Sequence, residues 1–219
     1  GHETEALANQ IARHYELAGE KSLAADYFKI AGDYARTLYA NAEALVHYRA
    51  ALELKNSQVF ETCEFSALHE SIGDMQTLLA DYTGALSSYA TAASLCEPRT
   101  LGNIEHKRGS VHHRRGEYAL AESHFQTALD ALIEEAHGER AKLLADWSLT
   151  AHALGDNERA QEMASRALAL AESAGDLRSI AQVRNILGIL ARSRGDPAQA
   201  HYQLEQSCAI AETLNDSSV

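Results

Sequence analysis

Apolar and small residues recur along most of the chain with a period near 3.6 residues, the period of an α-helix. In residues 82–95, for example, Ala85, Tyr89 and Ala92 are spaced i, i+4, i+7 and therefore lie on one helix face. Only 13 glycines and 2 prolines interrupt the 219 residues, which favours helix over strand. The sequence therefore predicts an all-α fold.

The same pattern occurs four times in succession. The copies are IGDMQTLLADYTGALSSYATAASL from residue 72, RGSVHHRRGEYALAESHFQTALDA from 108, WSLTAHALGDNERAQEMASRALAL from 147 and LGILARSRGDPAQAHYQLEQSCAI from 187. Each has a small residue early, then a Gly-Asp, Gly-Glu or Ala-Asp turn, then an anchoring alanine. These alanines are Ala85, Ala121, Ala160 and Ala200. We interpret each copy as a helix–turn–helix unit.

Glycines occupy two kinds of position in these copies. Those in the first helix would let the paired helix approach closely, and those in the turn suit a left-handed helix end. The first kind are Gly73, Gly109 and Gly188, and the second are Gly116, Gly155 and Gly195.

This pattern resembles the tetratricopeptide repeat (TPR), whose signature is a small and an aromatic residue in helix A and Ala…Phe/Tyr…Ala in helix B. The resemblance covers residues 66–213. It departs from the family in two copies, where Arg108 replaces an apolar residue of helix A and Ala164 replaces the aromatic of helix B. It implies a right-handed TPR-like α-solenoid of about eleven antiparallel helices, which we expect to form a single superhelical domain over residues 1–219.

Residues 1–57 follow the pattern more loosely. Ala24-Phe28-Ala31 and Ala44-Tyr48-Ala51 both fit helix B but are 20 residues apart, so one helix, about 22–39, must serve both neighbours. Residues 11–54 are also similar to the start of TPR arrays that follow the ATPase module of bacterial multidomain signalling proteins, including transcriptional regulators and adenylyl cyclases. This resemblance implies a sensor or regulatory array. Because the chain begins Gly-His, we expect it to be part of a longer protein.

The charge balance narrows the class of partner. A formal net charge of -12 disfavours general affinity for nucleic acid or a membrane surface, which both need a positive field. Cys63, Cys96 and Cys208 are far apart in the sequence and form no CxxC, so we expect small core residues in a reducing, cytoplasmic setting. We expect no membrane-spanning segment.

The sequence holds no catalytic motif such as GxSxG or SxxK, and we expect neither an enzyme nor a cofactor. The 11 histidines raise the question of a metal. His106 and His113 would share a helix face, but at i, i+7 they lie about 10.5 Å apart along the axis. That separation is too large for one ion, so no metal site is expected.

The run HKRGSVHHRR over residues 106–115 divides between two faces of helix A at about 100° per residue. Arg108, His112 and Arg115 fall on one arc. The opposite arc matches the concave groove of a TPR array and holds His106, Lys107, Ser110, His113 and Arg114.

Equivalent positions in the last two copies continue this arc. Ala145 takes the position of His106 in the third copy, and the predicted strip is cationic with an apolar floor. The added groove residues are Leu149, His152, Asn185, Ile189 and Arg192. Either these are ordinary solvated side chains, or an acidic peptide or amphipathic helix binds there. Protonation of the histidines below about pH 6.5 would make the strip more positive.

These observations favour a non-catalytic protein–protein interaction scaffold with a peptide or helix in its groove. One alternative is a self-associating, dimerising array, since Leu204, Ile210 and Leu214 of the last predicted helix are apolar. The other is a regulatory domain that binds a small-molecule effector in the groove.

Overall fold

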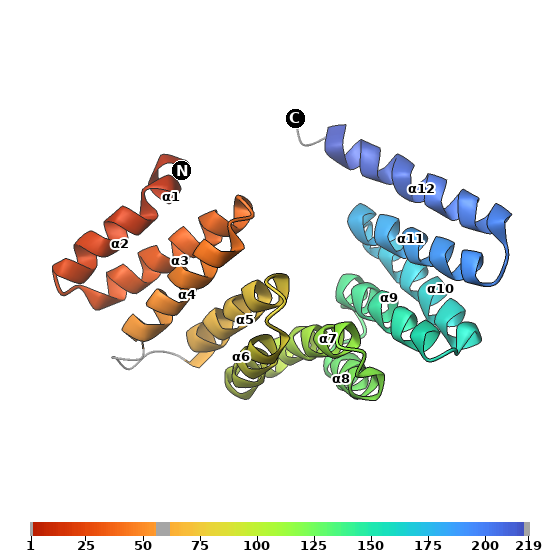
Figure 1. The fold of residues 1–219 in the computed structure, drawn as a ribbon, viewed down its shortest axis with the longest axis horizontal. Helices are drawn as coiled ribbons and strands as arrows, with labels where there is room; N and C mark the ends of the chain where they lie inside the picture. Colours follow the sequence, from red (N-terminus) through yellow and green to blue (C-terminus); the bar gives the residue numbers. More distant parts are fainter. Residues whose placement is uncertain (1, 56–61, 217–219) are drawn as a thin grey trace. The chain divides into compact units, whose positions relative to one another are not determined.

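The computed structural model describes residues 2–55 and 62–216, which hold helices and no strand. No helix in these ranges is long and apolar enough to cross a membrane. The described residues form twelve helices where about eleven were expected, because a short helix, α1, comes first (Figure 1). They are α1 (His2–Ala6), α2 (Ala8–Leu17), α3 (Lys21–Thr37), α4 (Asn41–Lys55), α5 (Thr62–Leu78), α6 (Tyr82–Leu95), α7 (Pro98–Arg114), α8 (Tyr118–Ala131), α9 (His137–Ala153), α10 (Asn157–Ala174), α11 (Leu177–Ser193) and α12 (Pro197–Asp216).

The chain divides into two compact units, Gly1–Thr100 and Leu101–Val219. Helices α1–α6 belong to the first unit. Helix α7 starts three residues before the boundary and runs into the second unit, which also holds α8–α12. A single superhelical domain over residues 1–219 stays a prediction.

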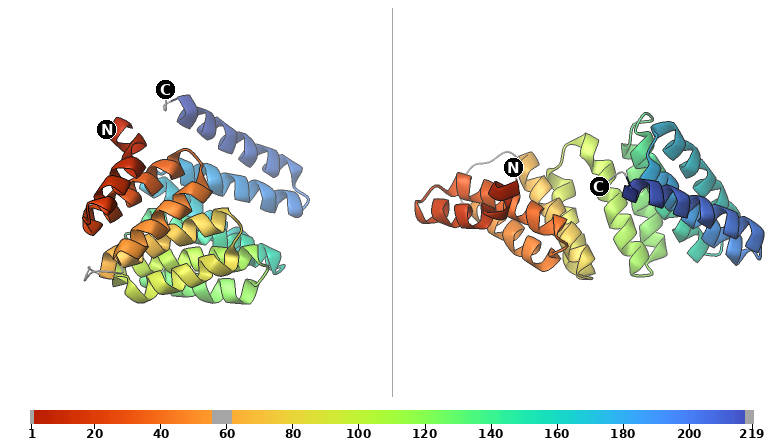
Figure 2. Two further views of the ribbon diagram at one scale, coloured as in Figure 1. Left: turned by 60° about the vertical axis from the view of Figure 1, so that its left-hand side comes forward. Right: turned by 90° about the horizontal axis from the view of Figure 1, so that it is seen from above.

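In the first unit, α3 packs against both α2 and α4, as the short spacing of the N-terminal motifs predicts. From α2 to α6, successive helices of the unit run antiparallel, as Figure 2 shows. Phe28 of α3 and Tyr48 of α4 are fully buried, and Leu68 and Met75 of α5 join the same core. The Tyr48 hydroxyl donates to Asp33 Oδ1 at 2.8 Å. One amphipathic helix therefore acts as helix B of one pair and helix A of the next.

In the second unit, α9 pairs with α10 and α11 with α12. Phe125 of α8 lies against Gly109 of α7, where an added Cβ would approach the ring to 2.5 Å. Trp147 of α9 is only 5% exposed, and the Arg159 guanidinium lies 5.2 Å from its ring centroid. The predicted close approach at Gly109 is confirmed, and Trp147 belongs to the core of the unit.

The turns between paired helices confirm the predicted left-handed positions. Gly116, Gly155 and Gly195 have φ of +74°, +86° and +77°. In the first unit, the same conformation is held by Tyr39 at +58° and Ala80 at +60°. The turn geometry is thus kept even where glycine is absent.

The prediction that the cysteines are small core residues is wrong. Cys63 and Cys96 are half-buried, and Cys208 on α12 is exposed. Their small size led to the error, because cysteine is often fully buried in folded proteins.

Candidate functional site

Helix α7 presents the two predicted faces of the basic run. On the predicted groove face, His106, Lys107, Ser110 and His113 are half-buried, and Arg114 is exposed. The side chains of the opposite face contact carboxylates of the same unit. The contacts are Arg108–Glu105 at 2.7 Å, His124–Glu105 at 2.6 Å, His112–Glu117 at 2.6 Å and Arg115–Glu117 at 2.8 Å. About half of the side chains of the basic run are therefore held by contacts within the fold.

Glu105 shows how strongly these contacts act. Its side chain is only 6% exposed, and burial alone raises the pKa of a carboxyl group. Hydrogen bonds from His124 and Arg108, together with their charges, outweigh burial and leave the pKa of Glu105 below its ordinary value. The ionised carboxylate is thus stabilised inside the fold.

On the groove side, the centre of the site is a residue that the repeat frame did not select. The Asp146 carboxylate of α9 lies 2.9 Å from His106 Nε2 and accepts a hydrogen bond from Ser110 Oγ at 3.1 Å. Gln182 of α11 also donates to it at 3.4 Å. Asp146 therefore links the first helices of three successive repeats.

This arrangement corrects the predicted strip. Ala145, which was matched to His106, is 1% exposed and belongs to the core. The next residue, Asp146, which takes the position of Lys107 in the third copy, faces α7 instead. The strip is therefore not uniformly cationic, since a carboxylate lies at its centre. The sequence feature that could have identified Asp146 was an acidic residue next to a predicted groove position.

A cavity of about 130 Å³ opens beside Asp146. Phe125 and Leu149 give it apolar walls, and Arg114 stands at its exposed edge. The full lining is Ser110, His113, Arg114, Phe125, Asp146 and Leu149. The cavity thus combines apolar surface with groups of both charges, an arrangement typical of sites that orient a ligand.

His113 is held in one position at the wall of this cavity. Its Nδ1 lies 2.8 Å from Thr150 Oγ1 of α9, and Thr150 is fully buried. Burial lowers the pKa of His113, with the Arg114 charge acting in the same direction and the Asp146 charge against it. His113 is therefore a neutral imidazole at neutral pH.

The remaining predicted residues lie outside the cavity. His152 Nδ1 is 2.8 Å from Asn157 Oδ1, so this imidazole contacts the first residue of α10. On α11, Asn185 and Arg192 are exposed and Ile189 is half-buried. Because α11 packs against α9, these side chains can extend the site but do not form its centre.

Comparisons with known proteins agree with the fold. A family model described as tetratricopeptide repeat matches residues 100–173 and 139–213, which together span more than half of the chain. No curated protein matches the sequence.

Solved structures share the architecture at low sequence identity. BtubC (BKLC) from P. vanneervenii is 17% identical with a TM-score of 0.76, over 97% of this chain and 90% of that chain. The Rap conjugation gene regulator of plasmid pLS20, solved with the Phr* peptide, is 18% identical with a TM-score of 0.76, over 91% of this chain and 56% of that chain. YrrB, a TPR protein with an unusual peptide-binding site, is 16% identical with a TM-score of 0.55, over 97% of this chain and 100% of that chain.

The helix pairs, the turn glycines and the match over residues 100–213 all lead to one assignment. The chain belongs to the tetratricopeptide repeat family.

Proposed function

We propose that this protein is a non-catalytic scaffold that binds a peptide or helix on the face formed by α7, α9 and α11. The observation that carries the proposal is the cavity beside Asp146, where apolar walls meet hydrogen-bonding groups fixed by their neighbours. Fixed groups cost little entropy on binding, which favours recognition of an ordered segment.

The cavity suggests how a peptide would be held. An apolar side chain would enter between Phe125 and Leu149 and be removed from water there. The exposed guanidinium of Arg114 would contact an acidic residue nearby, and Arg192 of α11 would contact a second one farther along the groove. The expected ligand is thus an acidic peptide or amphipathic helix with one apolar anchor.

The structural neighbours support binding of this kind. One Rap protein was solved with the Phr* peptide, and another with competence and sporulation factor. We propose further that the chain is the cytoplasmic regulatory region of a larger bacterial signalling protein. That context rests on the resemblance of residues 11–54 to arrays that follow signalling ATPases.

Peptides selected from a displayed random library on the full chain would test the proposal. Their Kd would then be measured by titration calorimetry against the wild type, Leu149→Ala and the double variant His113→Glu/Arg192→Glu. We expect each variant to weaken binding at least about tenfold, or about 1.4 kcal/mol. Arg166→Glu is the matched control, because Arg166 is exposed on α10, outside the cavity lining. Equal affinity for all four proteins would reject the site.

Self-association is a second candidate function, favoured by one observation on α12. Leu204 takes the helix B position of Tyr89 and Phe125 but is 38% exposed, and Tyr202, on a different face of α12, is 50% exposed. Two copies would pair through the exposed apolar side chains of α12. Light scattering of wild type and Tyr202→Glu over a range of concentrations decides the matter, since a wild type that stays monomeric when concentrated excludes the dimer.

A further inference from the structure

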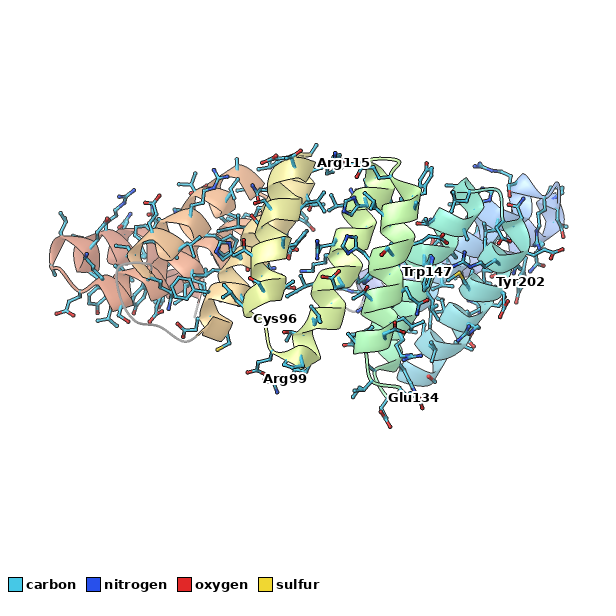
Figure 3. The ribbon with its side chains drawn as sticks, turned by 90° about the horizontal axis from the view of Figure 1, so that it is seen from below. Cys96, Arg99, Arg115, Glu134, Trp147 and Tyr202 are labelled. Carbon is cyan, nitrogen blue, oxygen red and sulfur yellow. The ribbon has the colours of Figure 1, made fainter. Side chains whose placement is uncertain are left out.

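Cys63 and Cys96 line the same cavity in the first unit. This cavity has a volume of about 200 Å³, and Ser66 and Glu70 of α5 also contribute to its wall. Cys96 directly follows the last residue of α6, and Figure 3 shows it above Arg99, near the start of α7. Two thiols that are distant in the sequence thus face one solvent-accessible space.

The register of the helix pair places the two thiols at the same height. Ser66 Oγ of α5 donates to the Ala92 carbonyl of α6 at 2.9 Å, which fixes these residues opposite each other. Cys63 lies three residues before Ser66, and Cys96 lies four residues after Ala92. Because the helices are antiparallel, these steps of about 4.5 and 6 Å run in the same direction.

The rotation of the helices places the thiols on the same side of the pair. At about 100° per residue, Cys63 is turned roughly 60° from Ser66, and Cys96 roughly 40° from Ala92. In antiparallel helices these rotations move both side chains toward the same side. The hydrogen bond at Ser66 holds the two helices close together about one turn from the cysteines. The shared cavity agrees with this geometry.

We propose that Cys63 and Cys96 form a redox modification site, closing an intramolecular disulfide in the presence of a low-molecular-weight disulfide such as oxidised glutathione. One protein thiolate attacks a glutathione sulfur and releases the first glutathione. The second protein thiolate then attacks the resulting mixed disulfide and releases the other glutathione. Two protein thiols are oxidised, one glutathione disulfide is reduced, and the two thiol protons end on the two released glutathiones.

The crosslink has a defined structural consequence. It joins the first turn of α5 to the residue that directly follows α6, and α7 begins two residues later at Pro98. Oxidation would therefore fix the end of the first unit, next to the boundary at residues 100 and 101. The site is separate from the proposed peptide groove, all of which lies in the second unit.

The test uses the full chain with Cys208→Ser, which removes the exposed thiol, treated with oxidised glutathione and examined by intact mass. We expect the loss of two hydrogen atoms and no added glutathione. The matched variants Cys63→Ser/Cys208→Ser and Cys96→Ser/Cys208→Ser should each gain one glutathione instead. Circular dichroism of each variant checks that the fold is kept.

Peptide mapping locates the bond. Trypsin leaves both thiols on one fragment, because no Lys or Arg lies between Lys55 and Arg99. Cleavage after glutamate, at Glu64 and Glu70 among others, separates Cys63 from Cys96, so their fragments stay joined only through a disulfide. Two glutathiones on Cys208→Ser, disulfide-linked dimers, or two thiols that remain free after treatment would each overturn the proposal.

Discussion

The turn before α6 holds Ala80 in the left-handed conformation, with φ of +60°. An L-residue there costs roughly 1–2 kcal/mol more than glycine, because its Cβ crowds the following carbonyl. The side chain of Ala80 is exposed, so its removal sacrifices no packing. Ala80→Gly should therefore relieve this strain without any other loss.

The net gain is smaller than the strain itself. Glycine has more freedom in the unfolded chain, and this offsets roughly 0.5–1 kcal/mol of the gain. We expect Ala80→Gly to raise the free energy of unfolding by about 0.5–1 kcal/mol. For a unit of this size that corresponds to a rise in Tm of roughly 2–8 °C.

Gly19 supplies the matched control in the same unit. It has φ of +82°, and an added Cβ would meet open space, so Gly19→Ala introduces strain without a clash. We expect destabilisation of similar size. Urea titrations followed by far-UV circular dichroism measure both changes, with the slope m as a check on two-state behaviour. Ala80→Gly lowering the midpoint, or Gly19→Ala leaving it unmoved, would refute the argument.

Three further predictions concern the second unit. Gly109→Ala should lower the stability of this unit by about 1–3 kcal/mol, because the new Cβ would press on the buried Phe125 ring. Gly138→Ala is the control and should not lower it, because its Cβ meets open space. Trp147 fluorescence in urea titrations compares the two variants. Glu105 has a lowered pKa, so its contribution to stability is present above about pH 4.3 and lost as pH falls through the folded-state pKa. In urea titrations, the difference in the free energy of unfolding between wild type and Glu105→Gln should shrink over that range. A difference that stays constant with pH would contradict this. Burial lowers the pKa of His113, so as pH falls the unfolded state takes up this proton before the folded state does. Wild type should therefore lose stability below about pH 6.5, and His113→Gln should weaken that loss in a pH series of thermal melts. Identical pH profiles for the two proteins would contradict this prediction.

Local sequence determined the repeat architecture. Helix periodicity and the anchoring alanines depend on contacts within a helix or between adjacent helices, which recur at a fixed spacing. The left-handed conformation of Gly155 is equally local, because it belongs to a single turn. The division of the basic run between two faces of α7 also followed from the angular step of the helix alone.

The contacts that build the candidate sites were decided by the tertiary structure. Asp146 meets His106 across 40 residues, and helix periodicity could not distinguish it from the neighbouring Ala145. The cavity shared by Cys63 and Cys96 likewise depends on the register of α5 against α6. The physical reason is that a periodic pattern fixes which face of a helix is buried, whereas rotation and sliding of the packed helices decide which side chains meet.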